Sequence, residues 1–242
     1  MKVRRLPAVA AALAAVGGVC TMAGPGHGPA STAAAVTVDP GRFDAPRPNP
    51  YFPLRPGTVS RYRGTDGGER FRERVVVTHR TKVIQGVTTT VVSDILRRDD
   101  GTVAERTHDW YASDNDGDVW YFGESTATYD RGGHVDRDGS WQAGVRGASA
   151  GLIMPADPRP TDAYRQEFLR GHAEDQAWIV QRNARTTVPY GKLRHVVRSF
   201  EWSRLEKPVL SLKLYAPGIG IVREMDMSGG SESFSLVSVH RG

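Results

Sequence analysis

The sequence predicts a mainly β protein: a curved antiparallel sheet or partly closed β-barrel, with at most one or two short helices and a long Gly/Pro-rich excursion. Many runs rich in β-branched and aromatic residues follow one another from residue 69 onward. Short turn sequences separate these runs, as in an antiparallel meander. A long meander must cover its apolar side, so we expect the sheet to curl around itself or close.

Strand patterns are clearest in the first half of this region. In ERFRERVVV, charged and apolar residues alternate, and Phe71, Val75, Val77 and later Val83 share one parity. Gln85-Gly86 and the Asp-Gly pair at 100–101 are turn sequences. The expected strands are Glu69–Ile84, Val87–Leu96 and Thr102–Ala112.

The second half repeats this pattern after a long interruption. Residues 129–162 are rich in Gly, Asp and Pro and predict an excursion or a lid. Residues 163–171 are the best helix candidate, with Asp162 as N-cap and a strand as the alternative. The expected strands are Ala177–Thr187, Leu193–Trp202, Val209–Tyr215, Ile219–Met227 and Ser231–His240.

The N-terminus has the features of an export signal. Basic residues precede an apolar run of about 14 residues, too short to span a bilayer comfortably. We therefore predict a signal peptide at 1–23, a disordered Gly/Pro/Ala-rich linker at 24–48 and a single β-rich domain at 49–242. The mature chain is expected to be secreted, without a transmembrane span. Anchoring as a lipoprotein through Cys20 is the alternative.

The net charge of +5 falls to about +2 without Lys2, Arg4 and Arg5, since 29 basic and 27 acidic side chains remain. The remaining arginines are interleaved with acids, as in Arg97-Arg98-Asp99-Asp100. This pattern predicts a mixed-charge surface and no nucleic-acid partner.

An acidic stretch, WYASDNDGDVWYFGE, lies between two aromatic runs. Asp114, Asp116 and Asp118 alternate as in the first half of a calcium loop. Val119 replaces the glycine at the sixth position of that loop, and Ser125 replaces the glutamate at the twelfth. A hairpin turning at Asp116-Gly117 is the simpler prediction. Calcium stays a weak candidate, and no other cofactor is expected.

Two kinds of hydrolase are weighed as alternatives. Gly147-Ala148-Ser149-Ala150-Gly151 matches the nucleophile elbow, with His195, His172 or His240 as the possible base, but it lacks the flanking strand and helix. A pair of carboxylates such as Asp109 and Glu124 could hydrolyse glycosides if a cleft separated them suitably. Enzymatic activity is the less favoured prediction.

Two motifs carry a resemblance. The opening Tyr51-Phe52-Pro53-Leu54-Arg55-Pro56-Gly57 and the closing Tyr215-Ala216-Pro217-Gly218-Ile219-Gly220-Ile221-Val222 resemble a group of exported proteins of unknown function, frequent in actinobacteria. The resemblance covers residues 49 to about 240. It implies a curved sheet similar to lipoprotein-carrier or lipocalin-like cups, and it transfers no catalytic residues.

These observations favour a secreted or envelope-attached binding protein. The expected ligand is a lipid or other apolar molecule in the sheet's concavity, or an envelope component. A structural domain without a ligand is a further alternative. Pocket candidates are Trp110, Trp120, Phe122, Trp178 and Trp202, with Phe200, Leu212, Leu214 and Phe234 as further inward residues.

Overall fold

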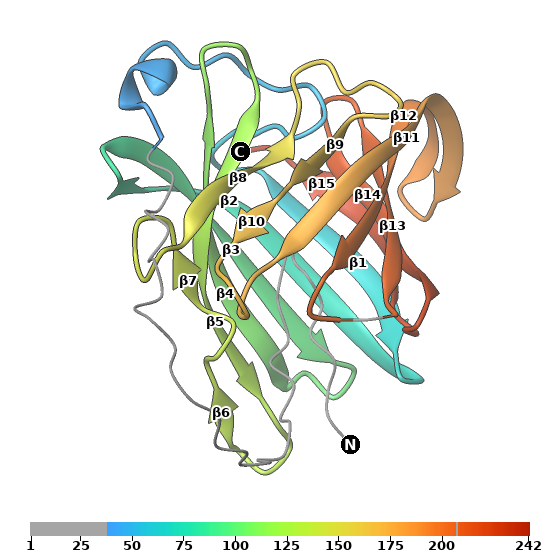
Figure 1. Cartoon of the computed structure of the whole chain (residues 1–242). Helices are drawn as coiled ribbons and strands as arrows, with labels where there is room; N and C mark the ends of the chain where they lie inside the picture. The colour runs from blue at the N-terminus through green and yellow to red at the C-terminus, as the bar shows by residue number, and fades with distance from the viewer. Residues whose placement is uncertain (1–37, 207) are drawn as a thin grey trace, which may run out of the picture.

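The computed structural model describes residues 38–206 and 208–242. They form one 15-stranded antiparallel sheet that curls into a nearly closed barrel (Figure 1). The mainly β prediction is confirmed. The elements are η1 (Pro40–Phe43), β1 (Val59–Asp66), β2 (Glu69–Ile84), β3 (Val87–Arg98), β4 (Val103–Ser113), β5 (Val119–Tyr129), β6 (Val135–Asp136), β7 (Trp141–Gln142), β8 (Ser149–Met154), β9 (Ala163–Arg165), β10 (Glu167–Phe168), β11 (Asp175–Val188), β12 (Gly191–Ser203), β13 (Leu210–Ala216), β14 (Gly220–Ser228) and β15 (Ser233–His240).

Two meanders build the barrel. Strands β1 to β5 follow one another as hairpins, β11 to β15 do the same, and β15 pairs with β1. The two ends of the sheet are β10, paired with β8, and β9, paired with β11. Because β9 and β10 are separated only by Gln166, one short segment bridges the two edges. The N–H of Gln166 donates to the Asp175 carbonyl at 2.8 Å, which strengthens this seam.

The seam corrects one expectation. Residues 163–171 form strands and a turn rather than a helix, so the strand alternative holds. Tertiary pairing prevails there because this segment supplies the partners of both sheet edges. The preceding excursion contains the short strands β6 and β7 beside β5, and then β8.

Alternation along β2 separates charges between the two sides of the barrel wall. Phe71, Glu73 and Val77 point inward, while Arg72 and Arg74 are exposed. The expected mixed-charge surface is therefore wrong for this wall: its acids lie inside and its arginines outside. Val83 is 65% exposed, because the register shifts between Val77 and Thr81.

The N-terminal segment closes one end of the barrel (Figure 1). Buried Asn49 fastens it: its Nδ2 donates to the carbonyls of Gly117 and Pro155 at 2.9 and 3.0 Å. Its Oδ1 accepts from the N–H groups of Tyr51 and Phe52. Residues 38–48, expected to belong to the linker, pack on the barrel instead: Val38 is buried against it and Arg42 contacts Asp114.

The predicted export signal, Cys20 and residues 24–37 lie outside the described residues. Within the described part of the chain, no helix is both long and apolar enough to cross a membrane.

Candidate functional site

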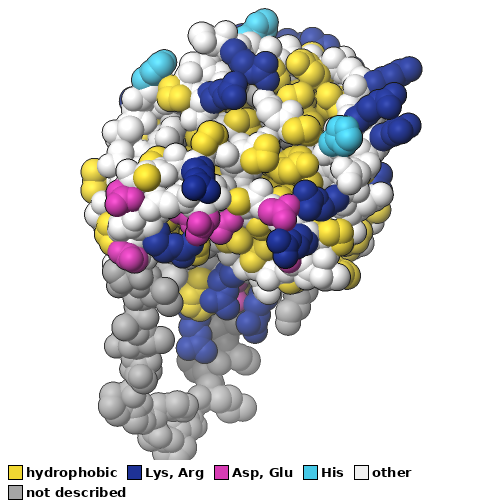
Figure 2. Space-filling view, turned by 90° about the horizontal axis from the view of Figure 1, so that it is seen from above, with side chains coloured by type: hydrophobic (Ala, Val, Ile, Leu, Met, Phe, Trp, Pro, Cys, Tyr) yellow, Lys and Arg dark blue, Asp and Glu magenta, His cyan; other side chains and the backbone are white. Residues whose placement is uncertain are grey.

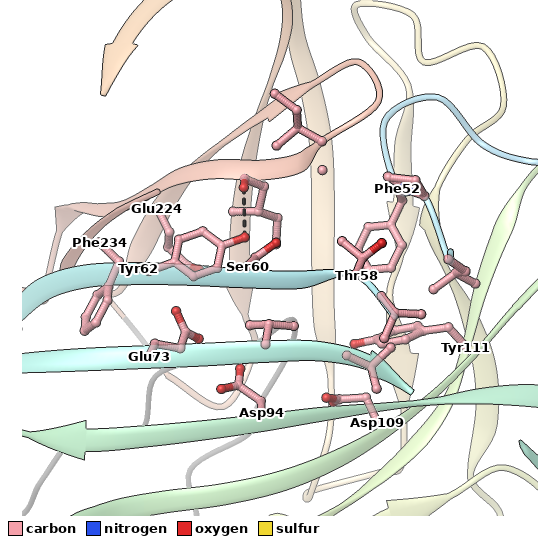
Figure 3. Close-up of a pocket in the computed structure, with 18 residues that line it drawn as sticks. Phe52, Thr58, Ser60, Tyr62, Glu73, Asp94, Asp109, Tyr111, Glu224 and Phe234 are labelled. Carbon is pink, nitrogen blue, oxygen red and sulfur yellow. Dashed lines mark hydrogen bonds between the residues drawn. The ribbon is translucent and has the colours of Figure 1, made fainter. Parts of the chain in front are cut away.

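A cavity opens inside the barrel beneath the N-terminal segment (Figure 3). It leaves about 80 Å³ for the centres of water-sized molecules. At roughly 10–15 Å³ for each water, this is room for about six waters or a ligand of similar size. Its lining residues are Phe52, Pro53, Leu54, Thr58, Ser60, Tyr62, Glu73, Val75, Val77, Val92, Asp94, Asp109, Tyr111, Ile219, Gly220, Ile221, Glu224 and Phe234.

Four carboxyl groups meet at this cavity. Glu73, Asp94 and Asp109 come from the adjacent strands β2, β3 and β4, and Glu224 comes from β14 (Figure 3). Asp94 is only 3% exposed, and among the described residues no donor group reaches either of its carboxyl oxygens. A hydrogen bond between two carboxyl groups requires a proton on one of them, so Asp94 and Glu73 pair only when one is protonated.

Burial raises the pKa of these acids. It raises the pKa of Asp94 well above its ordinary value, and the neighbouring Glu73 raises it further. Burial also raises the pKa of Glu73 and of Asp109, although Asp109 accepts a 2.9 Å hydrogen bond from the Tyr121 hydroxyl. The pKa of Glu224 rises to about 8 for the same reason. Burial therefore disfavours the ionised form of these acids, and a positive charge placed among them would favour it.

Buried Lys213 on β13 lies beside the cavity acids. Its Nζ is 2.9 Å from Glu201 and 3.3 Å from Glu224. Burial raises the pKa of Glu201, but Lys213 and hydrogen bonds from Ser199 and Tyr215 outweigh burial and lower it. One lysine cannot neutralise both acids, and Glu201 has the better set of donors. Glu224 is consequently the acid left protonated.

Apolar side chains form the rest of the cavity wall. Val75, Val77 and Val92 line it from β2 and β3, and Phe52 covers it with its ring 5.1 Å from that of Tyr111. The Tyr62 hydroxyl donates to the Ile221 carbonyl at 2.9 Å. Acids on one side and apolar groups on the other suit an amphipathic cation.

Pro53 and Leu54 separate this cavity from an outer groove of about 500 Å³. Prolines of the N-terminal segment and residues of β3 and β4 line the groove, with Arg47 and Arg55 at its edge. Viewed from above, this end shows apolar side chains with lysine and arginine side chains around them (Figure 2).

Most of the predicted pocket residues lie elsewhere. Phe234 lines the cavity, but none of the five leading candidates does among the residues described. Lys82 covers Trp110, with its Nζ 3.3 Å from the ring centroid, and Phe43 packs on Trp120 and Phe122. Trp178 is 42% exposed, and Trp202 is partly exposed on β12. Trp110 and Phe122 are thus buried in the hydrophobic core, whereas Trp178 and Trp202 reach the outer surface of β11 and β12.

The acidic stretch forms the predicted hairpin between β4 and β5. Asp114 Oδ1 accepts from the N–H groups of Asp116 and Asp118, and Oδ2 accepts from Trp120 Nε1 and Arg42. These donors occupy the oxygens that a calcium ion would need. Asp118 accepts from the Ala156 N–H, and the side chain of Asp116 is exposed. Within the described chain, no group of three or more His, Cys, Asp or Glu side chains is arranged to hold a metal ion.

The serine hydrolase alternative lacks its geometry. Ser149 begins β8 and pairs with Phe168, so it lies in a sheet rather than at a strand-to-helix turn. His195 lies exposed on β12, with Nδ1 3.3 Å from the Asn183 oxygen. His172 Nε2 contacts the Ser140 carbonyl at 3.2 Å.

The carboxylate-pair alternative lacks space. Asp109 and Glu124 face each other across β4 and β5 inside the barrel. A glycosidase needs a sugar ring between its two acids. The cavity of about 80 Å³ is too small for a sugar ring and an attacking water.

Sequence reasoning considered Asp109 only as part of a carboxylate pair and missed the other cavity acids, because they look like surface charges. Glu73 stands between two arginines, and Asp94 stands between Ser93 and Ile95. The available indication was parity: Glu73 shares the parity of Phe71, Val75 and Val77, which marks it as inward.

No family model and no curated protein matches this chain. Among solved structures, a protein from Bacteroides fragilis NCTC 9343, designated an exported protein with a YmcC-like fold, is 13% identical, with a TM-score of 0.46. The match covers 79% of this chain and 99% of that one. A Parabacteroides distasonis ATCC 8503 protein designated a lipoprotein is also 13% identical, with a TM-score of 0.42 over 80% of this chain and 100% of that one. Both similarities concern the fold alone.

Proposed function

We propose that this protein is an exported binding protein whose barrel interior takes a small organic cation. The N-terminal sequence supports export, either as a free protein or anchored through Cys20. The observation that carries the ligand class is the cavity itself, where Asp94 lies buried without a donor beside Glu73, Asp109 and Glu224.

The ligand is expected to be an ammonium or guanidinium group with a short apolar part. Its charged end would donate hydrogen bonds to the carboxyl groups of Asp94 and Glu73. Its apolar part would pack against Val75, Val77 and Phe52. A lipid is disfavoured, because an acyl chain exceeds the cavity volume of about 80 Å³ and would place methylene groups against acids. The apolar ligand expected from the sequence is therefore narrowed to a short amphipathic cation.

Calorimetry with three four-carbon probes tests this proposal. Butylammonium, butanol and butyrate differ in charge and hardly in size. At a ceiling of about 1.5 kcal/mol for each heavy atom, five atoms cannot bind tighter than micromolar, so we expect a Kd between about 10 μM and a few mM for butylammonium. Butanol should bind at least tenfold more weakly, and butyrate should not bind.

The variant Asp94→Asn keeps the shape and removes the charge. It should weaken butylammonium binding about tenfold or more, while the exposed Asp116→Asn variant should bind as the wild type does. Equal affinity for butanol and butylammonium, or an unchanged Asp94→Asn variant, would contradict the proposal. Binding of decanoate but not butylammonium would favour the lipid-carrier alternative, and binding of none of the probes would favour a structural domain.

A further inference from the structure

The outer side of strands β1 to β4 carries an array of arginines. At outward positions these strands present Arg61, Arg63, Arg72, Arg74, Arg97 and Arg106, here called the arginine wall. All six are exposed. The outward positions of these four strands, every one of them described, hold no Asp or Glu.

Strand register brings these arginines together. Arg61 is opposite Arg74, and Arg63 is opposite Arg72, which is in turn opposite Arg97. Like charges directly opposite each other destabilise a sheet. At the edge of the wall, Asp99 lies 3.3 Å from Arg72 and also contacts Arg70. One acid leaves most of the wall uncompensated, and a strand surface does not need arginine for folding.

The pKa of a neighbouring histidine is lowered by the positive charge of this region. Burial lowers the pKa of His108 on β4, and Arg80 and Arg106 lower it further. The wall therefore disfavours an added positive charge and favours an anion.

Geometry narrows the partner to a linear polymer. The wall is the convex side of a barrel (Figure 1). Of the exposed large apolar side chains in the described chain, only Val83 lies on these four strands, near the end of β2 and away from Arg72 and Arg74. It therefore lacks the side chains that insert into a bilayer. Trp110 is the only Phe, Tyr or Trp residue at an outward position of these four strands, and Lys82 covers it. Stacking platforms for nucleic-acid bases are thus missing from the wall.

Spacing and chemistry favour phosphate. Alternate residues on a strand are about 6.6 Å apart, and adjacent strands are about 4.8 Å apart. A short polyol linker separates neighbouring phosphodiesters by a distance similar to the spacing of about 6.6 Å between alternate residues of one strand. Guanidinium groups bind phosphate oxygens in pairs, and Thr65, Ser93 and Ser238 beside the arginines offer hydroxyls to the linkers.

We infer that the arginine wall binds a linear, base-free polymer of phosphodiester-linked polyol units. This inference is independent of the cation cavity, because the wall lies on the opposite face of the strands. Binding should depend strongly on salt, since each phosphate contact releases counterions and contributes about 0.7–0.9 to the slope of log K against log salt.

The test uses a synthetic glycerol-phosphate polymer on the full domain and on two triple variants. Arg63→Gln, Arg72→Gln and Arg74→Gln remove the centre of the wall. The control triple, Arg137→Gln, Arg170→Gln and Arg194→Gln, changes the net charge equally at exposed sites away from it. The wall triple should lose at least tenfold in affinity at 0.15 M salt and reduce the salt slope by about two to three. The control triple should stay within about threefold of the wild type.

Circular dichroism melting checks folding, and the wall triple should melt no lower than the wild type, because like-charge pairs are removed.

Three results would overturn the inference. The first is an equal loss of affinity in both triples, which would indicate net charge alone. The second is absence of binding to the polymer at 50 mM salt. The third is tighter, wall-dependent binding of single-stranded oligothymidylate, polygalacturonate or phosphatidylglycerol vesicles of matched charge, which would assign the wall to nucleic acid, a carboxylate polymer or a membrane.

Discussion

Lys213 shows how single residues keep the barrel interior polar. Burial by itself lowers the pKa of this lysine, but Glu201 and Glu224 outweigh burial and raise it. Its ion pair with Glu201 is supported by hydrogen bonds from Ser199 and Tyr215, so the charges are paired and their oxygens are used. Such pairs are costly to break, because the remaining charge has no partner.

Lys213→Met is therefore expected to destabilise the protein by about 3–5 kcal/mol, since it leaves Glu201 buried without its cation. Urea denaturation at pH 7 measures the change. The exposed Lys192→Met serves as the control and should change stability by less than about 0.5 kcal/mol. A loss below about 1 kcal/mol for Lys213→Met would show that Glu201 is stable without this lysine.

At the scale of elements, local pattern predicted the hairpins well. Alternation and turn sequences located β2 to β4 within a few residues and the turn before β5, because each strand contacts its sequence neighbour. The β9–β10 seam could not be predicted this way. Its conformation is fixed by pairing with β8 and β11, and the local sequence of residues 163–168 does not indicate those partners. The first strand, β1, was also missed, because its apolar residues are few.

Gly151 makes the seam possible. It lies on β8, where an added Cβ would overlap the backbone of Gln166. Gly151→Ala should cost about 1–3 kcal/mol and speed amide hydrogen exchange across residues 163–168. Gly132→Ala, at an exposed turn with only Asp130 nearby, is the matched control. Unchanged exchange in the seam of Gly151→Ala would mean that the barrel does not depend on this close approach.

At the scale of the whole molecule, the sheet acts as a partition between acids inside and arginines outside. Composition and net charge predicted a mixed surface, because they do not record which face of a strand a residue occupies. For β2, the odd or even position of a residue indicates its face. Bulges in β4, β11 and β13 shift that alternation, so the full set of inward acids can be identified only from the strand register. For the same reason, the sequence pattern alone predicts pocket positions for tryptophans that face outward.

The inward acids predict an unusual pH dependence of stability. The pKa of Glu224 rises from 4.5 to about 8, and that of Asp175 rises from 3.8 to about 7. Between pH 5 and pH 7 the unfolded chain has lost these protons and the folded chain keeps them. Stability should therefore fall as pH rises, by up to about 1.4 kcal/mol per pH unit for each proton retained. Urea midpoints at pH 5, 6 and 7 measure this slope.

Glu224→Gln removes one of the retained protons, so it should reduce the slope of stability against pH by up to about 1.4 kcal/mol per pH unit. The exposed Asp116→Asn should leave that slope unchanged. Wild-type stability that increases from pH 5 to pH 7 would show that the interior acids are ionised in the folded protein.

The most direct measurement of the central claim is the number of protons released when butylammonium binds. Acids that hold their protons in the empty cavity must ionise to pair with the ammonium group. Calorimetry at pH 7 in phosphate and in Tris separates binding heat from buffer protonation heat. The cavity described here predicts release of close to one proton for each butylammonium bound, and less for Asp94→Asn. Equal heats in the two buffers, with butylammonium bound, would contradict it.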